Sequence, residues 1–310
     1  MRFHVQQALR ALVLLVFCIL IFKMHYTGEV TKYINPKYES LSQVASIIFL
    51  ILFFIQTTRI WTVKDEHSHH CEDHSCSHDH GNTSFTMRKF VSYVIIIFPL
   101  VTGFLLPPKT LGADIASKKG GMAVISNKQQ TTKEVQEEVE PETEDIQEYI
   151  PEHTQDDSLL DAPLNPNQET ISKEEYDRLI QKLVNSQTVD LDEYVFYDYY
   201  EEMHKDINQY QGRSIKLKGF VYKEEGFTNN QLVISRFAIT HCVADASIVG
   251  YLSEFPDASS LDEDTWIEAE GVIELTTYND MELPMIKITK WSKVEQPKDP
   301  YIYPLSVKLL

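Results

Sequence analysis

Positive charge is scarce in this sequence. Its 310 residues include 28 Lys and Arg against 46 Asp and Glu, which gives a formal net charge of −18. A nucleic-acid interface needs basic side chains gathered on one face, where they neutralise phosphates. The carboxyl-terminal half has no such concentration, so we expect no nucleic-acid partner.

Charge of either sign is nearly missing from three segments, residues 11–22, 44–61 and 90–108. A helix that crosses a bilayer core needs about 17–25 apolar residues, and the second and third segments meet that length. The first segment is shorter and resembles the apolar part of a signal peptide, but no A-x-A-like cleavage site follows it. We therefore expect three spans through the lipid bilayer rather than two.

The three apolar segments also lack Asp, Glu and His. Ionisable side chains inside a membrane mark the routes of ions and protons, and three helices alone make a poor pore. Transport by this chain alone is therefore not expected.

Apolar residues are in turn scarce between residues 129 and 170, where Glu, Asp, Gln, Thr and Pro predominate. Such a segment buries too little apolar surface to offset the entropy of ordering the chain. We expect a membrane domain over residues 1–108, an acidic disordered linker over 109–171 and a soluble domain over 172–310.

Potential metal ligands are concentrated between the second and third spans. Imidazole and thiolate suit zinc and its neighbouring transition metals, and eight such groups so close together bring four within bonding distance in almost any loop conformation. Their spacing matches no closed zinc finger. We expect a loop at residues 65–80 that binds zinc or another transition metal through His67, His69, His70, Cys71, His74, Cys76, His78 and His80.

Lysines and arginines near the span ends give no orientation by number alone. All arginines before the soluble domain lie on the side of the amino terminus and the metal-binding loop. A reducing cytosol would also keep Cys71 and Cys76 as thiols. We therefore expect a protein of the bacterial plasma membrane, with the amino terminus and the loop cytoplasmic and the carboxyl-terminal domain extracellular.

The soluble domain begins with a helical pattern. Ser172 and Glu175 have the spacing of a helix capping box ahead of an apolar stripe. A second helix is expected over residues 193–209, with His204 at its surface or its end. These two helices precede the β-rich part of the domain.

Beyond Gly212 the pattern becomes that of β-strands separated by turn residues. Gly219 and Gly271 stand in the middle of two of these strands, as glycines do at tight bends of small barrels. We expect an α+β membrane protein that ends in a mainly β, OB-like small barrel, and a sandwich fits the strand count equally. The five expected strands are residues 215–222, 232–239, 248–252, 266–275 and 285–294.

A second group of potential ligands follows one of these strands. His241, Cys242 and Asp245 could bind a metal, or Cys242 could be a reactive thiol beside a base. Cys242 could equally be a small buried apolar residue. Since the outer domain offers no second histidine-rich motif to act as base and orienter, we expect no enzyme activity.

The sequence resembles the YcgQ-like family of membrane proteins in four stretches: GRSIKLKGFVY, LVISRFAITHCVADA, WIEAEGVIE and PYIYP. The resemblance is good over residues 190–304 and looser over the membrane segments. It implies an OB-like outer module and a polytopic permease-like membrane protein as partner. Members often carry adjacent cysteines where this chain has His241 and Cys242, and that exchange favours metal ligation over a disulfide.

Two functional hypotheses follow from these features. In the first, the protein is a membrane-anchored accessory subunit of a permease-like system that is linked to zinc or other transition-metal handling. In the second, it is a surface-tethered module whose barrel recognises an extracellular ligand and has no role in transport. Core or edge packing is the commoner fate of the aromatic residues that could face such a ligand, namely Tyr222, Phe227, Tyr251 and Tyr278.

Overall fold

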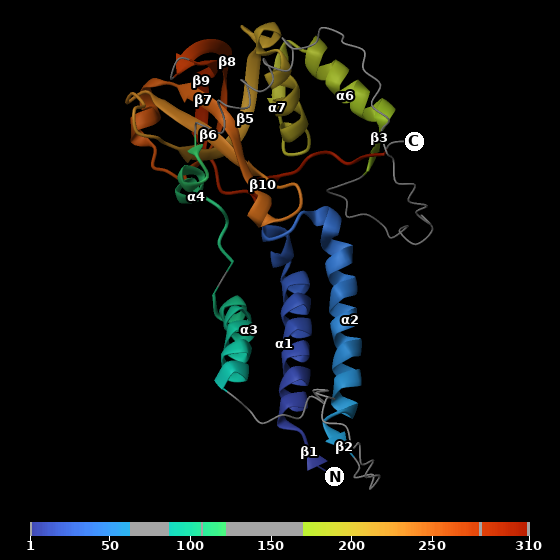
Figure 1. Cartoon of the computed structure of the whole chain (residues 1–310). Coiled ribbons are helices and arrows are strands. Elements are labelled where there is room, and N and C mark those ends of the chain that lie inside the picture. The colour runs from blue at the N-terminus through green and yellow to red at the C-terminus, as the bar shows by residue number, and fades with distance from the viewer. Residues whose placement is uncertain (1, 63–86, 107, 122–169, 279–280, 309–310) are drawn as a thin grey trace, which may run out of the picture. The chain divides into compact units, whose positions relative to one another are not determined.

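The computed structural model describes most of the chain and resolves it into two compact units (Figure 1). The first unit holds residues 1–33 and 38–109, and the second holds residues 34–37 and 110–310. The short segment 34–37 therefore belongs to the second unit, although it connects two helices of the first. The residues described are 2–62, 87–106, 108–121, 170–278 and 281–308.

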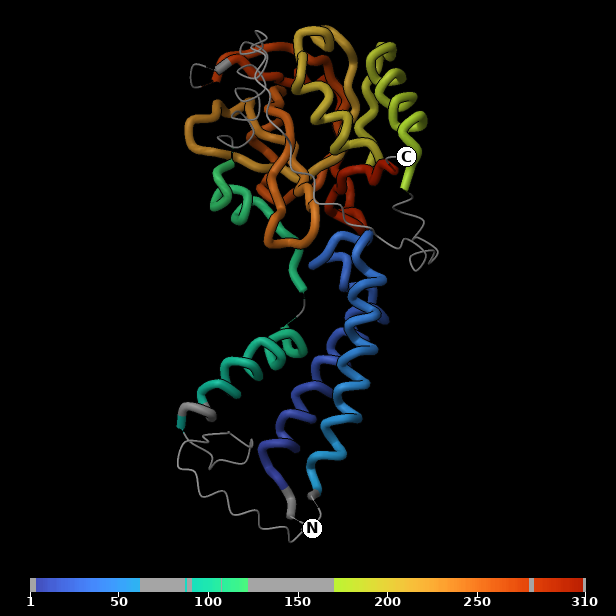
Figure 2. The backbone as a smooth tube through the Cα atoms, turned by 45° about the vertical axis from the view of Figure 1, so that its right-hand side comes forward, coloured from blue at the N-terminus to red at the C-terminus, as the bar shows by residue number. Residues whose placement is uncertain are grey.

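Helices make up the first unit: α1 (Val5–Thr27), α2 (Glu39–Thr58) and α3 (Met87–Leu105). Helices α1 and α2 run side by side as an antiparallel hairpin in both views (Figures 1 and 2). Phe17 and Phe49 stack between them with ring centroids 5.6 Å apart. At the open end of the hairpin, strand β1 (Arg2–Phe3) pairs with strand β2 (Trp61–Thr62).

Two segments of this unit are long and apolar enough to cross a membrane, Val5–Thr27 and Pro36–Thr58, and helix α3 adds a shorter apolar stretch, Val91–Leu105. The sequence marks residues 11–22 as the weakest of three spans, whereas the structure extends them into a helix of 23 residues. The extension arises because flanking polar residues continue the helix. It also brings ionisable groups into the helices, and His25 Nδ1 lies 3.4 Å from Glu39 Oε1.

The second unit is built on a seven-stranded sheet with the order β10-β6-β7-β9-β8-β5-β4. Strand β5 also pairs with β6, from Phe220 opposite Ser235 to Tyr222 opposite Val233, so the sheet partly closes on itself. Within the closed part, β7 and β9 are parallel and the other pairs are antiparallel. The strands are β4 (Thr188–Leu191), β5 (Ser214–Tyr222), β6 (Gln231–Ala238), β7 (Ser247–Glu254), β8 (Trp266–Tyr278), β9 (Met281–Lys293) and β10 (Tyr301–Ile302).

Two mid-strand glycines allow neighbouring strands to approach closely. A Cβ atom at Gly219 would lie 2.5 Å from the carbonyl oxygen of Ser235, and one at Gly271 would lie 2.5 Å from the carbonyl oxygen of Lys287. The β8–β9 register also shifts between Glu270 and Gly271. Both positions agree with the tight bends expected from the sequence.

Helices cover part of the sheet (Figure 1). Helix α6 (Lys173–Asn185) begins at Ser172, whose side chain accepts the Glu175 N–H, so the predicted cap is confirmed. Helix α7 (Phe196–Lys205) contributes Phe196, Tyr200 and Met203 to the core. The chain end returns to this region through β11 (Val307–Lys308), which pairs with β3 (Ile171–Ser172). The short helix α4 (Ala113–Lys118) lies in the first part of the expected linker. It contributes Ala113 and Ala116 to a second core cluster, which includes Phe220 and Trp266.

The prediction for the second helix needs correction. Helix α7 begins at Phe196 and ends at Lys205, and a separate 3-10 turn follows over Ile207–Tyr210. Of the two positions expected for His204, the helix end is confirmed, because the residue lies in the last turn of α7. The surface position is wrong, because only 6% of this residue is exposed. Its Nδ1 lies 2.7 Å from the Tyr200 carbonyl oxygen, and its ring packs on the Tyr200 ring at 4.0 Å. Tertiary packing, which helical spacing does not reveal, buries this face of the helix.

All five expected strands are present, and each extends one to several residues beyond its expected range at one end or both. Strands β4 and β10 were not expected. They are only 4 and 2 residues long, too short for an alternation of polar and apolar residues to stand out.

The four aromatic candidates for ligand recognition pack in or against the core. Tyr222 and Tyr251 are buried. Phe227 and Tyr278 meet edge to face with ring centroids 5.7 Å apart and pack against the core cluster that includes Tyr222. The expectation of core or edge packing is therefore confirmed.

Candidate functional site

A groove of about 440 Å³ opens along the β4 edge of the sheet, between the β4–α7 loop and strands β5 and β8. Charged residues of both signs alternate with two leucines in its wall. The lining residues are Asp190, Leu191, Asp192, Glu193, Tyr194, Lys216, Leu217, Lys218 and Glu268.

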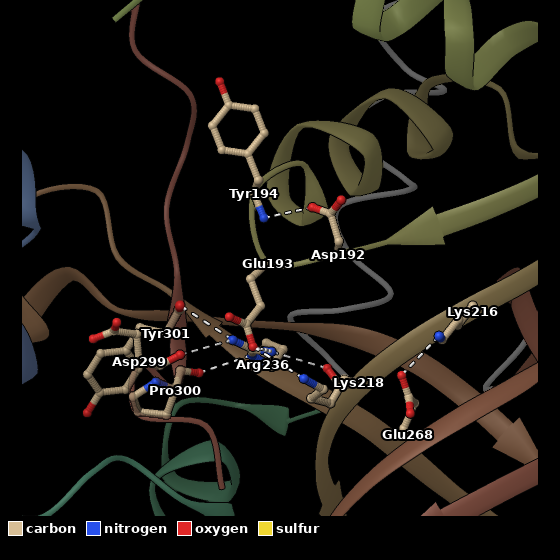
Figure 3. Close-up of polar contacts among 10 residues, drawn as sticks. All are labelled: Asp192, Glu193, Tyr194, Lys216, Lys218, Arg236, Glu268, Asp299, Pro300 and Tyr301. Atoms are coloured by element: carbon tan, nitrogen blue, oxygen red, sulfur yellow. Dashed lines mark hydrogen bonds and ion pairs between the residues drawn. The ribbon is translucent and has the colours of Figure 1, made fainter. Parts of the chain in front are cut away.

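The loop that carries the acidic wall is held by Asp192. Its Oδ1 atom accepts the backbone N–H groups of Tyr194 and Val195 at 2.8 and 3.1 Å. An Asp side chain that accepts the N–H groups two and three residues on fixes a tight turn. Glu193, between the acceptor and the donors, is therefore set in one orientation at the groove wall (Figure 3).

Both lysines of the groove are paired with carboxylates, one on the neighbouring strand β8 and one on the β4–α7 loop. Lys216 Nζ lies 3.1 Å from Glu268 Oε1, and Lys218 Nζ lies 3.5 Å from Glu193 Oε1. The hydrogen bond to Glu268 and the charge of that carboxylate raise the pKa of Lys216 above its ordinary value. These pairs are solvent-exposed, so they add little stability and can exchange partners with a charged ligand.

A buried arginine lies behind the groove. Only 1% of Arg236 is exposed, and its guanidinium lies 3.9 Å from Glu193 Oε1 and 5.0 Å from the centre of the Trp266 ring. Burial lowers the pKa of Arg236 to about 10, although the Glu193 charge acts in the opposite direction. The cation is therefore retained at neutral pH, and Glu193 is its carboxylate partner.

Backbone carbonyls complete the environment of Arg236. Its Nε donates to the Pro300 carbonyl at 3.0 Å, and its other nitrogens donate to the carbonyls of Asp299, Tyr301 and Lys218 (Figure 3). Arg236 thereby ties the segment that enters β10 to strands β5 and β6. It supports the groove from behind and does not line it.

The groove can recognise a ligand by charge and hydrogen bonding. Its lining contains no Cys, His or Ser nucleophile, and its carboxylates outnumber its ammonium groups. Sequence reasoning misses this site because β4 is too short to be recognised. The alternation of Lys216 and Lys218 in a half-buried strand is the one signal that points toward it.

The second predicted ligand group forms a local turn. Asp245 Oδ2 accepts the His241 N–H at 2.7 Å and lies 3.0 Å from His241 Nδ1, while Asp245 Oδ1 accepts the Cys242 N–H at 3.3 Å. Burial acts to raise the pKa of Asp245, but the hydrogen bonds from His241 and Cys242 outweigh it and lower that pKa. The structure thus brings the three residues together, with both carboxylate oxygens engaged in the turn.

In the part of the chain that the structure describes, no group of three or more His, Cys, Asp or Glu side chains is arranged to hold a metal ion. His241, Cys242 and Asp245, although they share one turn, therefore do not form such a group in this structure. The predicted loop ligands at residues 67–80 lie outside the described residues. Zinc or transition-metal binding at either place stays a prediction.

The same turn receives the segment that connects α1 to α2. Ile34 forms a β-bridge with Cys242, and the Asn35 N–H donates to the His241 carbonyl at 2.9 Å. The Asn35 side chain donates to the carbonyls of Ile239 and Thr240 at 3.2 and 2.9 Å. Nothing in the sequence marks Asn35 for this role, because its partners are some 200 residues away.

Comparisons with known proteins agree with this two-unit organisation. Residues 9–122 match the DUF1980 N-terminal domain and residues 166–304 match the DUF1980 C-terminal domain. The chain is 30% identical over 303 residues to UPF0703 protein YcgQ of Bacillus subtilis, a match that covers 95% of this chain and 98% of the relative. No solved structure matches.

A second relative comes from Streptococcus mutans and carries the provisional name of two-component membrane permease complex subunit. It is 24% identical over 287 residues, which cover 90% of this chain and 93% of the relative. Apolar helices joined to a sheet-rich unit define a membrane-associated protein of two folded units. Within that class, the chain belongs to the YcgQ-like family.

Proposed function

We propose that this protein is a membrane-anchored accessory subunit of a permease-like system. The observation that carries the proposal is the insertion of residues 34–37 into the sheet-containing unit. Both ends of this segment continue into apolar helices, so the chain joins the sheet-containing unit to α1 and α2 as well as to α3. The name of the Streptococcus mutans relative supports the same class of function.

The same contact supports three membrane spans. Asn35 and Ile239 are hydrogen-bonded within one unit, so both lie on one side of the membrane. The chain between them must then cross the membrane an even number of times. Because α2 is a candidate span and the acidic linker has no apolar stretch, we propose α3 as the crossing that returns the chain. Its 19 residues span about 28 Å at 1.5 Å per residue, close to the thickness of a bilayer core.

The pairing pattern supports an OB-like barrel for the sheet-rich region. Following hydrogen-bonded neighbours, strands β5, β6, β7, β9 and β8 form a ring that returns to β5. Five strands in a partly open barrel, with one parallel pair introduced by a crossover, fit the OB-like class better than a two-layer sandwich. We propose the OB-like assignment on this basis.

The partner of the subunit is proposed to be a polytopic membrane protein. When the full chain is purified from membranes in a mild detergent, one polytopic protein is expected to co-elute with it from a size-exclusion column in constant stoichiometry. Asn35→Ala is expected to weaken this complex, while Asn208→Ala, at an exposed asparagine on the sheet unit, leaves it intact. Recovery of the chain as a lone monomer from native membranes would refute the proposal.

The orientation can be tested with the cysteines already present. We propose that the sheet unit lies outside the cell and residues 65–80 inside. A membrane-impermeant maleimide applied to intact cells is then expected to label Cys242, and the labelling should vanish in Cys242→Ser. Cys71 and Cys76 should react only after lysis. Labelling of either loop cysteine in intact cells would reverse the assigned orientation.

We further propose that this subunit handles a transition metal, because the His and Cys side chains of the loop sequence are suitable metal donors. Titration of the full chain with Zn²⁺ is expected to show micromolar or tighter binding that is lost when residues 67–80 are excised. A Cys242→Ser variant separates the turn from the loop. Unchanged binding after the excision would remove the loop from the metal site, and absence of binding in the intact chain would end the metal proposal.

The groove at β4 favours a second candidate function, the recognition of an extracellular ligand. Its open charged wall fits a polar ligand of mixed or positive charge. Glu193→Gln is expected to weaken such binding without loss of the folded state. A deletion strain complemented equally well by the Glu193→Gln variant and by the unmodified chain would count against this candidate.

A further inference from the structure

A pocket of about 510 Å³ lies among the three helices of the first unit. Its polar lining comes from all three helices: Gln6 and Arg10 on α1, Gln56 on α2, and Ser92 and Tyr93 on α3. Each of these residues lies within the first or last two turns of its helix. The polar groups therefore gather at one end of the helical unit.

The pocket becomes apolar in the direction of the helix centres. The other lining residues are Val13, Leu14 and Ile96. Because a helix rises about 1.5 Å per residue, Leu14 lies about 12 Å beyond Gln6 along α1. A polar mouth over an apolar base follows the gradient from headgroups to acyl chains in one leaflet of a bilayer.

The depth of the pocket agrees with this gradient. Trp61, in β2, is 54% exposed and follows α2 directly. Exposed tryptophans at helix ends mark the level of the headgroups. Gln56 lies two residues before the end of α2 and five residues before Trp61, so the pocket mouth lies near that level. The Gln56 amide also hydrogen-bonds to the Gln7 side chain, which holds α1 against α2 beside the pocket.

Arg10 gives the pocket its charge. It is the one charged residue among those that line the pocket, and no acidic side chain of the described residues forms an ion pair with it. Arginine side chains near the ends of membrane helices extend to the headgroup level, where phosphate groups are the available anions, and Arg10 is exposed at such a position. Its planar fork matches the oxygens of a phosphate group in a bidentate manner.

We propose that this pocket binds the phosphate headgroup of an anionic phospholipid. Arg10 holds the phosphate oxygens, the amides and hydroxyls at the mouth surround the headgroup, and the first acyl methylenes lie on Val13, Leu14 and Ile96. The inference rests on the membrane spans of the proposed function. It adds a lipid site and a reason for an arginine two turns into α1.

The test uses the purified full chain in a non-ionic detergent, with bound lipid counted by native mass spectrometry. Phosphatidylglycerol is titrated against the unmodified chain, Arg10→Gln, Tyr93→Phe and the control Arg59→Gln. Arg59 is exposed at the end of α2 and does not line the pocket. We expect one phosphatidylglycerol per chain, unchanged binding in Arg59→Gln, and an affinity lowered about tenfold or more in Arg10→Gln, as for the loss of a charge-assisted pair.

Two further arms identify the ligand. Phosphatidylcholine is expected to bind more weakly than phosphatidylglycerol, and millimolar inorganic phosphate is expected to displace little lipid. Equal binding by Arg10→Gln and the unmodified chain, or complete displacement by inorganic phosphate, would overturn the lipid site. So would a pocket filled by a carboxylate of a co-purified protein in place of lipid.

Alkaline extraction of the same membranes separates this inference from the proposed function. A chain that stays in the membrane but binds no phosphatidylglycerol refutes the lipid site alone. A chain released into the soluble fraction refutes the spans and, with them, the anchored subunit. Circular dichroism of Arg10→Gln verifies that its helices are retained, and Tyr93→Phe, which removes only a hydroxyl, gives a milder second measure of the same pocket.

Discussion

The side-chain amide of Asn35 donates a hydrogen bond to the Thr240 carbonyl at 2.9 Å, although 205 positions separate the two residues in the sequence. Asn35 is 3% exposed and also donates to the Ile239 carbonyl. A connection between two apolar helices is thus held inside the sheet-containing unit. The carbonyls of Ile239 and Thr240, in the segment after β6, accept both of these hydrogen bonds.

Asn35→Ala is expected to lower the free energy of unfolding of the sheet-containing unit. Two carbonyls would lose their donor in a buried place, at a cost of about 1–3 kcal/mol. Denaturant unfolding of the full chain in detergent, followed by the near-ultraviolet signal of the sheet-unit aromatics, measures this change. Asn208→Ala serves as the matched control, and an equal stability of the two variants would contradict the role of Asn35.

Asp198 is expected to make stability depend on pH. Its carboxylate accepts the Leu305 N–H at 3.0 Å. Burial raises the pKa of Asp198 from an ordinary 3.8 to about 6, against the opposing effect of that hydrogen bond. The folded state therefore favours the protonated carboxyl more than the unfolded state does. The stability that this pKa difference contributes is fully present below about pH 4. It is lost as the pH rises through about 6, by up to about 3 kcal/mol.

Asp198→Asn keeps an acceptor for Leu305 and removes the titration. Unfolding midpoints of this variant and of the unmodified chain, measured between pH 4 and 8, should diverge as the pH rises, with the variant the more stable at pH 8. Parallel curves across this range would show that Asp198 does not titrate as proposed.

Gly271→Ala is expected to destabilise the sheet by about 1–3 kcal/mol, as overpacking does. Its new methyl group would meet the Lys287 carbonyl oxygen at 2.5 Å and the Ile286 side chain at 2.7 Å, so the β8–β9 pair must separate. Thermal unfolding compares it with Thr277→Ala at an exposed position of the same strand, which should change little. An unaltered melting temperature in Gly271→Ala would mean that the strands can move apart freely.

Arg236→Met is expected to cost about 3 kcal/mol of unfolding free energy, because the buried carbonyls of residues 299–301 lose their donors. The unfolding free energy of Arg236→Lys should fall between those of the unmodified chain and Arg236→Met, since an ammonium group cannot reproduce the planar fork of a guanidinium. Arg178→Met, on the exposed part of α6, is the control and should shift stability by less than about 0.5 kcal/mol. Limited proteolysis near residue 300 should increase only in the Arg236 variants.

Local patterns in the sequence were enough for much of this fold. The apolar segments predict the helices of the first unit, Ser172 predicts the start of α6, and alternation with turn residues predicts strands β5 to β9. These features depend on contacts between near neighbours along the chain, and so the sequence records them directly.

Contacts between distant residues were decided by the tertiary structure. The groove beside β4 and the polar pocket around Arg10 each join side chains from three or more separate elements. The burial of His204 joins α7 to β7, and the carbonyls around Arg236 come from Lys218 and from residues 299–301. The docking of Asn35 joins residues on either side of two apolar helices. In the sequence these residues stand as isolated polar positions. The partners that give each of them a role are distant along the chain and are brought close only by folding. The prediction that residues 67–80 bind metal rests, by contrast, on composition alone, and it is the clearest functional prediction that the sequence makes by itself.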